Sequence, residues 1–217
     1  MSEAPPLPAP AARGWKIDEA RRRAVLDAYE LDALRDSAAL RQITDFAARL
    51  CDAPIALVSL VEERRQMFLS RTGLDAGETP RAQSLCAHAM LEDDVMVVPD
   101  TSRDPRFADN PLVTGDTHIR FYAGAPLVSD DGIPLGSLCV IDTEPRDGLT
   151  AIQHEGLLVL AANVLARLRD SRDGAAWRAA ENDARRAALD SETRFRTLAD
   201  TMPQMVWSTL PDGYHDY

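Results

Sequence analysis

Cysteine, lysine and long apolar runs are scarce in this sequence of 217 residues. The three cysteines, Cys51, Cys86 and Cys139, are odd in number and widely spaced, which excludes a disulfide framework and indicates reduced thiols in a cytoplasmic protein. No apolar run reaches the roughly 18 residues that a transmembrane helix needs. Residues 1–15 are rich in Pro and Ala and lack the apolar core of a secretory signal, so we expect a disordered tail there.

Positive charge is also in deficit. The 24 Lys and Arg residues face 35 Asp and Glu residues, which gives a net charge of −11, and a single lysine is present. This balance argues against nucleic acid and against an anionic membrane surface as partners. A hydrophobic share of 45% supports a core, and the length allows one full domain plus part of another.

Common catalytic signatures are missing. The sequence has no P-loop and no G-x-S-x-G, H-E-x-x-H or C-x-x-C motif. His154 and Glu155 are adjacent, but the surrounding TAIQHEGLLVL lacks the pattern of a phosphoacceptor box, so we expect a surface histidine. No second cluster of ligand residues favours a metal site. We therefore expect the chain itself to be non-catalytic.

Apolar periodicity predicts two helices and a strand pair in the N-terminal part. The first helix covers residues 17–35, where no Gly or Pro interrupts, and the second covers 37–51. A buried strand is expected at 55–61 and a returning strand at 66–71, with a charged turn between them. The residues expected on the buried face of the second helix are Leu40, Ile43, Phe46, Ala47 and Leu50.

Two polar segments separate the shorter elements that follow. A loop at 72–83 precedes a short helix at 85–91, which Ser84 can cap, and a short strand at 95–98. The segment 100–120 contains turn residues throughout and shows little periodicity. A long ordered connection of this kind in a compact domain is often functional.

The stretch FYAGAPLVSDDGIPLGSLCVID, residues 121–142, predicts two apolar strands joined by an Asp-Gly turn. Neither strand alternates strictly, so we expect both faces of this hairpin to be covered in the middle of a sheet. Gly124 leaves room for close approach to the backbone, either by a packed helix or by a small ligand.

The C-terminal part is predominantly helical in its pattern. Thr150 and Gln153 form a capping box that begins a helix with an apolar face, and Gly174 is the expected break. The charged segment 171–190 predicts a helical linker. From residue 191 the pattern changes to a short helix, a strand and a Pro-Asp-Gly turn, which is typical of the start of another domain.

Several phrases resemble a known family when they are taken in order along residues 16–170. The phrases are APIALVSLVEERRQMFLSRTGLD, ETPRAQSLCAHAM, VVPDTSRDPRFADNPLV and IRFYAGAPLVSDDGIPLGSLCVID, and they resemble a GAF domain of bacterial signalling proteins. Residues 191–217 resemble the first part of a PAS domain. GAF followed by PAS is a common front end of sensor histidine kinases, often of the HWE type, in two-component systems.

The resemblance implies an α+β fold, a GAF-like central antiparallel β-sheet flanked by helices, with a C-terminal signalling helix. Residues 85–91 and 100–120 would enclose a pocket for a small-molecule ligand, with the hairpin as its floor. Ligand binding or a redox event would shift the loop and alter the helix that begins at Thr150. The terminal helices would form a homodimer and act on downstream PAS and kinase domains. The cofactor is unknown, and no metal is expected.

Candidate ligand-binding residues fall on the short helix, the long loop and the hairpin. Phe107 could cover an apolar ligand while Arg106 pairs with an anion, or the loop could fold on itself with Phe107 in the core. Arg120 and Asp142, at the two ends of the hairpin, could form a structural ion pair or bind the ligand. The full set is Cys86, His88, Arg106, Phe107, Asn110, Arg120, Phe121, Tyr122, Gly124, Cys139 and Asp142.

Three alternative functions stay open. Some GAF photoreceptors attach a bilin through a Cys followed directly by His, but Ala87 separates Cys86 from His88 and breaks that pattern. The family also contains a free methionine sulfoxide reductase that uses pocket cysteines, and Cys86 and Cys139 could converge for that chemistry. A ligand-free dimerisation module would fill the pocket with its own side chains, such as Phe107, Phe121 and Tyr122.

Overall fold

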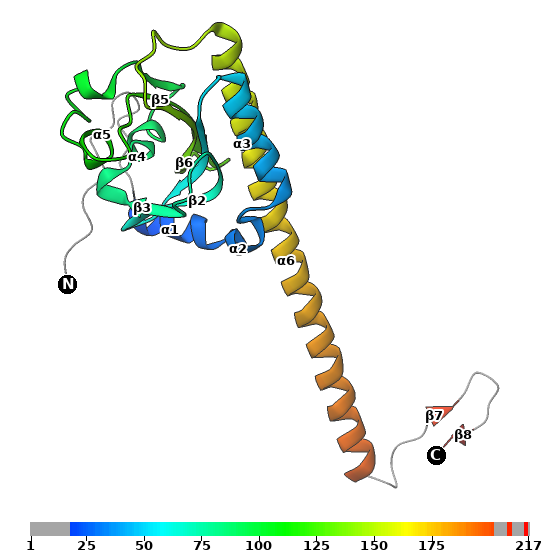
Figure 1. The fold of residues 1–217 in the computed structure, drawn as a ribbon. Helices are drawn as coiled ribbons and strands as arrows, with labels where there is room; N and C mark the ends of the chain where they lie inside the picture. The colour runs from blue at the N-terminus through cyan, green and yellow to red at the C-terminus, as the bar shows by residue number, and fades with distance from the viewer. Residues whose placement is uncertain (1–17, 202–207, 210–214, 217) are drawn as a thin grey trace. The chain divides into compact units, whose positions relative to one another are not determined.

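A six-stranded antiparallel sheet is the centre of the computed structural model, which describes residues 18–201, 208–209 and 215–216 (Figure 1). The chain divides into two units, Met1–Arg172 and Asp173–Tyr217, and this sheet belongs to the first. The predicted α+β class, with a central antiparallel sheet, flanking helices and a long C-terminal helix, is confirmed. In sheet order the strands are β3 (Glu78–Pro80), β2 (Arg65–Thr72), β1 (Ile55–Val61), β6 (Pro134–Asp142), β5 (Phe121–Val128) and β4 (Met96–Val98).

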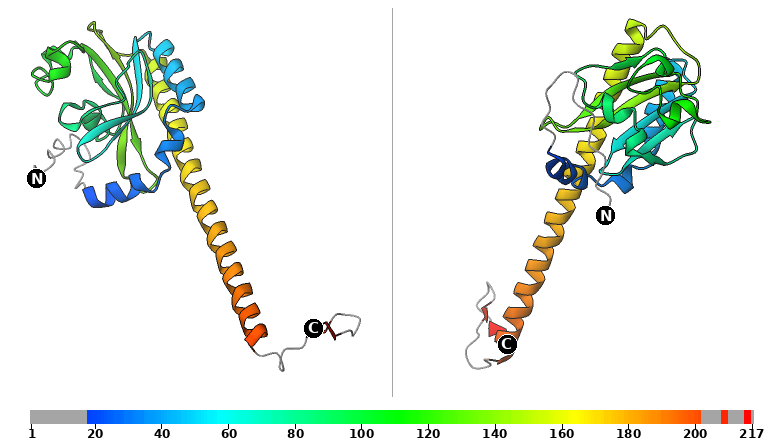
Figure 2. Two further views of the ribbon diagram at one scale, coloured as in Figure 1. Left: turned by 60° about the horizontal axis from the view of Figure 1, so that its bottom comes forward. Right: turned by 90° about the vertical axis from the view of Figure 1, so that its left-hand side faces the viewer.

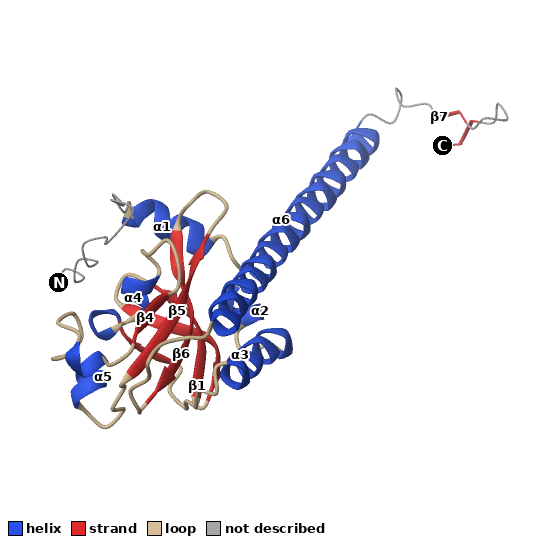
Figure 3. Cartoon of the chain, turned by 90° about the horizontal axis from the view of Figure 1, so that it is seen from above, coloured by secondary structure: helices blue, strands red, loops and turns tan. Residues whose placement is uncertain are grey.

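The sheet separates two buried clusters, because alternate residues of a strand point to opposite faces. Phe121 belongs to one cluster and its neighbour Tyr122 to the other. Helices α3 and α6 lie side by side on the Phe121 face, whereas α4 and α5 lie on the Tyr122 face (Figures 1 and 3). The helices are α1 (Glu19–Asp27), α2 (Leu31–Leu34), α3 (Ala38–Leu50), α4 (Cys86–Ala89), α5 (Pro111–Thr114) and α6 (Ala151–Thr201).

The predicted strands and the hairpin are confirmed. β1, β2 and β4 lie where the sequence places them, each within a residue at its ends. In the hairpin turn, Gly132 adopts a φ of 74° and its N–H donates to the carbonyl of Ser129 at 2.9 Å. β5 and β6 are interior strands with buried side chains on both faces, as their apolar runs predict.

The single helix predicted over residues 17–35 is wrong. The structure has two helices there, α1 and α2, and Tyr29 lies between them with only 6% of its surface exposed. The Tyr29 N–H donates to the carbonyl of Leu26 at 3.2 Å and turns the chain. No Gly or Pro marks this break, so packing of the Tyr29 ring in the core overrides a continuous helical preference.

The buried face of α3 differs from the predicted face at one position. Phe46, expected in the core, is 48% exposed, whereas Thr44 is fully buried. The Thr44 hydroxyl lies 3.1 Å from Ser70 Oγ and accepts a hydrogen bond from the Thr72 hydroxyl at 3.0 Å. Hydrogen bonds between hydroxyl groups therefore join α3 to β2, and the Phe46 ring that was expected on this buried face points away from it.

Helix α6 begins at the predicted capping box. The Thr150 N–H donates to Gln153 Oε1 at 2.9 Å, and the Gln153 N–H donates to Thr150 Oγ1 at 3.3 Å. Gln153 also donates from Nε2 to the carbonyl of Leu50, the last residue of α3, at 3.2 Å. The break expected at Gly174 is wrong, because α6 continues to Thr201 (Figure 2). One Gly costs only about 1 kcal/mol in a helix otherwise rich in Ala and Arg.

Short elements occupy both predicted loops. The loop at 72–83 contains β3 and the 3₁₀ helix η1 (Arg81–Gln83), and the segment 100–120 contains η2 (Thr101–Arg103) and α5. The helix expected at 85–91 is shortened to α4, whose Ala87 N–H donates to Ser84 Oγ at 3.0 Å. Elements of three or four residues are too short to show a period in sequence.

Some expectations concern residues outside the described part of the chain. The tail predicted at 1–15 lies there, as do residues 202–207, 210–214 and 217. In the segment 191–217 the structure describes the end of α6 and a short antiparallel pair, β7 (Ser208–Thr209) and β8 (His215–Asp216). Among the described residues, no helix combines the length and the apolar content needed to cross a membrane.

Candidate functional site

A small cavity lies on the Tyr122 face of the sheet. Its volume is about 80 Å³, well below the roughly 300 Å³ of a typical ligand pocket. Such a space holds a few water molecules or a molecule of similar size. The lining residues come from the sheet, the segment after β2, the start of α4 and the segment before β5: Ile55, Leu57, Gln66, Phe68, Leu74, Ala76, Thr79, Leu85, Cys86, Leu112, Thr117, Ile119, Tyr122 and Ile141.

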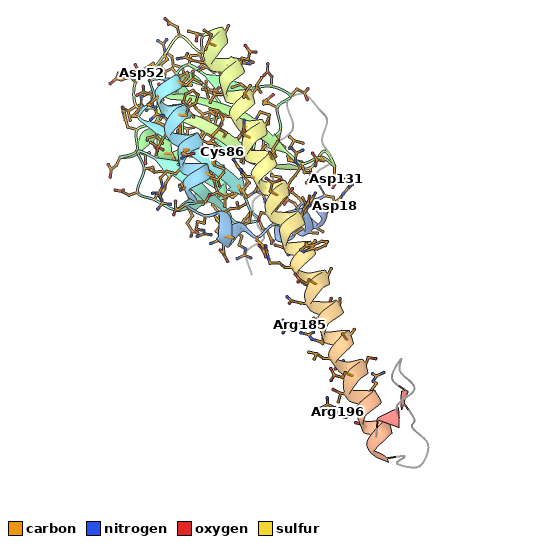
Figure 4. The ribbon with its side chains drawn as sticks, turned by 90° about the vertical axis from the view of Figure 1, so that its right-hand side faces the viewer. Asp18, Asp52, Cys86, Asp131, Arg185 and Arg196 are labelled. Carbon is orange, nitrogen blue, oxygen red and sulfur yellow. The ribbon has the colours of Figure 1, made fainter. Side chains whose placement is uncertain are left out.

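Two cysteine thiols meet beside this cavity. Cys86 begins α4 and Cys139 lies in β6, and their Sγ atoms are 3.6 Å apart. Cys86 lies inside the folded domain (Figure 4) and is 2% exposed. Its sulfur accepts hydrogen bonds from Gln66 Nε2 at 3.2 Å and from the Tyr122 hydroxyl at 3.3 Å. The Tyr122 oxygen is also 3.1 Å from Ser137 Oγ.

The two thiols differ in acidity. Burial opposes ionisation of Cys86, but hydrogen bonds from Cys139, Ser137 and Tyr122 outweigh it and lower the pKa of the Cys86 thiol to about 6. The hydrogen bond to Cys86, together with burial, raises the pKa of Cys139 well above its usual value. The pair therefore loses its first proton from Cys86 and keeps the second on Cys139.

Two buried hydroxyls, Ser59 Oγ and Thr79 Oγ1, lie near this cluster. Ser59 lies in β1 opposite Ser137, and its hydroxyl interacts with the Cys86 sulfur and helps to lower the pKa of that thiol. Thr79 lines the cavity, and its hydroxyl has no hydrogen-bond partner among the described residues. A buried hydroxyl without a partner is costly, so Thr79 is placed to bind a small polar molecule in the cavity.

The segment 100–120 folds on itself at its centre. Arg106 pairs with Asp104 at 2.7 Å, and its guanidinium lies 5.0 Å from the centre of the Phe107 ring. Phe107 is 1% exposed and contacts the His88 ring edge-on at 4.8 Å. Burial and the nearby charge of Arg106 lower the pKa of His88 to about 4. Of the two alternatives, the structure shows Phe107 as a core side chain outside the cavity lining.

Asn110 and Arg120 hold the same segment together. Asn110 Oδ1 accepts from the Leu112 N–H and caps α5, while its amide donates to the carbonyl of Gln83 at 3.1 Å. The Arg120 guanidinium donates to the carbonyl of Val113 at 2.9 Å. These contacts shape the wall of the cavity, and neither side chain lines it.

Arg120 and Asp142, at the two ends of the hairpin, do not form an ion pair with each other. The Arg120 N–H donates to the Asp142 carbonyl at 2.8 Å, but the Asp142 carboxylate pairs with Arg146. Arg146 also donates to the carbonyl of Cys51 at 2.6 Å and lies over the Phe121 ring. Asp142 and Phe121 therefore tie the hairpin to the α3 face, away from the cavity.

Gly124 does not leave open space. A Cβ atom there would lie 2.3 Å from the Tyr122 hydroxyl oxygen and less than 3 Å from its ring. The room expected for a helix or a ligand is taken by the Tyr122 ring. Of the predicted candidates, only Cys86 and Tyr122 line the cavity, and Cys139 lies directly behind Cys86.

Sequence reasoning missed four residues of the site: Ser59, Gln66, Thr79 and Ser137. Ser59 and Ser137 interrupt the apolar runs IALVSLV and LGSLCVI, and Gln66 precedes MFL in β2. A polar residue within a buried strand needs a partner, which is a usable signal for such a cluster. Thr79 lies in a strand that the sequence does not reveal.

Other parts of the described chain are less suited to ligand chemistry. No group of three or more His, Cys, Asp or Glu residues in these parts could hold a metal ion. A larger surface hollow of about 620 Å³ lies between α1 and the β1–β2 turn. Its charged side chains already pair there, Arg22 with Glu19 and Arg65 with Glu62.

Comparisons with known proteins agree with this architecture. A curated cyclic di-GMP phosphodiesterase of Pseudomonas aeruginosa is 44% identical over 157 residues, which cover 71% of this chain and 26% of that protein. The chain thus spans about a quarter of that relative. In fold, the chain is similar to a free methionine-R-sulfoxide reductase of Neisseria meningitidis, with a TM-score of 0.52 and 19% identity over 74% of this chain and 95% of that one.

A second solved structure is similar to the same extent. It is the GAF domain of an Acinetobacter phosphoenolpyruvate-protein phosphotransferase, with a TM-score of 0.52 and 15% identity over 72% of this chain and 97% of that one. At such identities the likeness concerns the fold alone. The family model described as GAF domain matches residues 37–168, which is more than half of the sequence. The chain belongs to the GAF domain family.

Proposed function

We propose that this chain is the sensory part of a signalling protein. A stimulus on the cavity side of the sheet would change the packing of α6 on the opposite side, and α6 would transmit the change to an output domain. The observation that supports this most is α6 itself. Thr150 and Gln153 fix its first turn, Leu157 and Leu168 are fully buried on the domain, and the helix continues to Thr201.

The output that we favour is a cyclic di-GMP phosphodiesterase. The relative of that name shares 44% identity with 71% of this chain, which supports a common regulatory role for the matched segment. The alternative output is a sensor histidine kinase of the HWE type in a two-component system, reached through a PAS domain at 191–217. The whole protein, assayed for cyclic di-GMP hydrolysis and for autophosphorylation from ATP, distinguishes the two.

The signalling unit in this proposal is a homodimer. Ile152 and Val159 are seven residues apart on α6 and are 74% and 56% exposed, and Phe46 on the adjacent α3 is 48% exposed. Exposed apolar side chains on two neighbouring helices favour a dimer in which the same surface of a second copy buries them. A change in α6 packing would then alter the pairing of the two copies.

The transmission step can be tested by changing the phase of α6. In a chimera, this chain replaces the matching segment of the Pseudomonas aeruginosa phosphodiesterase, and residues are inserted after the exposed Asp183. Inserting one heptad keeps the helical face in phase, whereas inserting four residues rotates it. We expect the rate of cyclic di-GMP hydrolysis to stay unchanged when seven residues are inserted and to change severalfold when four residues are inserted.

A matched control is the same insertion of four residues between Glu63 and Arg64, in the exposed turn that joins β1 and β2. It lengthens the chain equally and leaves α6 intact, so hydrolysis should not change. Equal hydrolysis by both α6 insertions would contradict transmission through this helix.

A reductase of free methionine sulfoxide is a second candidate, because Cys86 and Cys139 lie 3.6 Å apart. The cavity of about 80 Å³ would have to open for a substrate of that size, and further still for a bilin. Incubation with methionine sulfoxide and dithiothreitol tests the reductase, and formation of methionine that is lost in Cys86→Ser would support it.

A further inference from the structure

We infer that Cys86 and Cys139 form a redox-active dithiol that a hydroperoxide converts into an intramolecular disulfide. The inference deepens the proposed sensory function and rests on it for its signalling role. The chemistry at the two sulfur atoms can nevertheless be tested on the chain by itself. The stimulus class is then a small peroxide, which matches the small volume of the cavity.

The two sulfur atoms already lie close together. Their separation of 3.6 Å must shorten to about 2.05 Å in a disulfide. Cys139 is held in the interior strand β6, but Cys86 begins a helix of four residues between irregular segments. A small movement of α4 toward the sheet is enough to bring the sulfurs together.

The two cysteines are placed asymmetrically with respect to the cavity. Cys86 lines the cavity and Cys139 does not, so a molecule that enters meets Cys86 first. The Tyr122 hydroxyl and the Gln66 amide both donate to the Cys86 sulfur, which stabilises a thiolate there. Cys86 therefore attacks the oxidant, and Cys139 is placed to resolve the product.

A buried donor in the cavity lining is not used by any other group. Thr79 Oγ1 lacks a hydrogen-bond partner among the described residues and faces the same cavity as Cys86. A hydroxyl in this position can donate to a peroxide oxygen or to the oxygen of a sulfenic acid. The site thus offers hydrogen bonds to the oxygen that is transferred.

The reaction balances in two steps. The Cys86 thiolate attacks one oxygen of hydrogen peroxide, the O–O bond breaks, and with one proton the products are Cys86 sulfenic acid and water. The Cys139 thiol then attacks the Cys86 sulfur, the S–O bond breaks and a second water leaves. Two thiols lose two electrons and two protons, and one peroxide is reduced to two waters.

Cys51 provides an internal control. It is a buried cysteine of the other cluster, on the opposite face of the sheet. Burial raises the pKa of its thiol to about 11, and the charge of Arg146 offsets this only in part. Cys51 should therefore stay reduced under conditions that oxidise the pair.

The experiment treats the full chain with a stoichiometric amount of hydrogen peroxide and counts free thiols after denaturation. We expect the count to fall from three to one, with a mass loss of two hydrogen atoms and peptide mapping that joins Cys86 to Cys139. Dithiothreitol should restore three thiols. Cys51→Ser should oxidise at the same rate, and Cys139→Ser should accumulate a sulfenic acid at Cys86 that dimedone traps.

Three free thiols after treatment, or a disulfide that includes Cys51 or a second chain, would overturn the inference. Mapping of the unmodified chain decides this even where a variant fails to fold. The phosphodiesterase chimera then separates the two proposals. We expect hydrogen peroxide to change cyclic di-GMP hydrolysis by the chimera, and the Cys86→Ser chimera to lose this change. The effect of the four-residue insertion in α6 on hydrolysis should remain in Cys86→Ser. If the disulfide forms but the α6 insertions do not change hydrolysis, the redox-active dithiol is supported and transmission through α6 is refuted.

Discussion

His88, a candidate ligand residue in the sequence, is a half-buried histidine packed beside the core in the structure. Its ring packs edge-on against Phe107, and burial and Arg106 lower its pKa from 6.5 to about 4. In the unfolded chain the imidazole takes up its proton near pH 6.5, whereas in the folded chain it does so near pH 4. Between these values the unfolded state binds more protons, so acid destabilises the fold.

We expect the free energy of unfolding to fall by about 1–2 kcal/mol as the pH drops from 6.5 to 4, less than the full shift implies, because the ring is partly exposed. Urea denaturation at a series of pH values measures it. His88→Gln should flatten the slope, whereas His118→Asn, at an exposed histidine, should keep it. A slope that persists in His88→Gln would contradict this assignment.

At this scale the sequence predicts residue types better than contacts. The convergence of Cys86 and Cys139 follows from their places on a helix and a central strand, and the sequence anticipates it. The direction of Phe107 depends on the path of an irregular loop, which no periodic pattern defines. Gly124 is anticipated as a place of close approach, but the group that fills it belongs to the residue two positions earlier.

Among the elements, α3 and β2 are joined by hydroxyl groups instead of an aromatic contact. Thr44→Val removes the oxygen that meets Ser70 and Thr72 and leaves those hydroxyls without this partner in a buried layer. We expect a loss of about 1–3 kcal/mol in the free energy of unfolding. Phe46→Ser, two residues further along on the exposed side of α3, should change the free energy of unfolding of the monomer by less than about 0.5 kcal/mol. The reverse order, measured by urea denaturation, would show that Phe46 is the core residue.

The capping box at the start of α6 gives a second test. Thr150→Ala removes the acceptor for the Gln153 N–H and should cost about 1 kcal/mol. Gln153→Ala should cost more, because the amide also bonds to the carbonyl of Leu50. Thr193→Ala, within α6, is the control and should be neutral or slightly stabilising. Equal midpoints in thermal unfolding for all three variants would exclude a capping role.

The elements that the sequence predicts well are those with long periodic or apolar patterns, such as β1, the hairpin strands and α3. The break at Tyr29 is invisible because the local residues all tolerate a helix, and only the core contact of the ring decides it. Gly174 is the converse case, a residue that ends many helices and does not end this one. In both cases the decisive contacts come from residues beyond the local window.

For the whole molecule, the proposed homodimer depends on the exposed apolar residues of α3 and α6. Ile152→Glu and Val159→Glu together should shift the chain toward monomer in sedimentation equilibrium, because two carboxylates would be buried at the shared surface. Asp131→Asn, in the exposed hairpin turn outside α3 and α6, should leave the association unchanged. Identical masses for the double variant and the original chain would place the interface elsewhere.

The architecture as a whole is readable from the sequence, since the order of motifs resembles the family to which the chain belongs. The cavity size is not readable in this way, because it depends on how Tyr122, Leu112 and Ile119 fill one face of the sheet.

The contact between Gly124 and Tyr122 has a consequence for evolution. Because a Cβ at position 124 would lie 2.3 Å from the tyrosine oxygen, the two positions cannot diverge independently. Descendants of this sequence that acquire a side chain at position 124 should first, or at the same time, exchange Tyr122 for a shorter residue. Such a lineage would also lose the phenol that donates to Cys86. The two positions should therefore covary with the cysteine pair across related sequences.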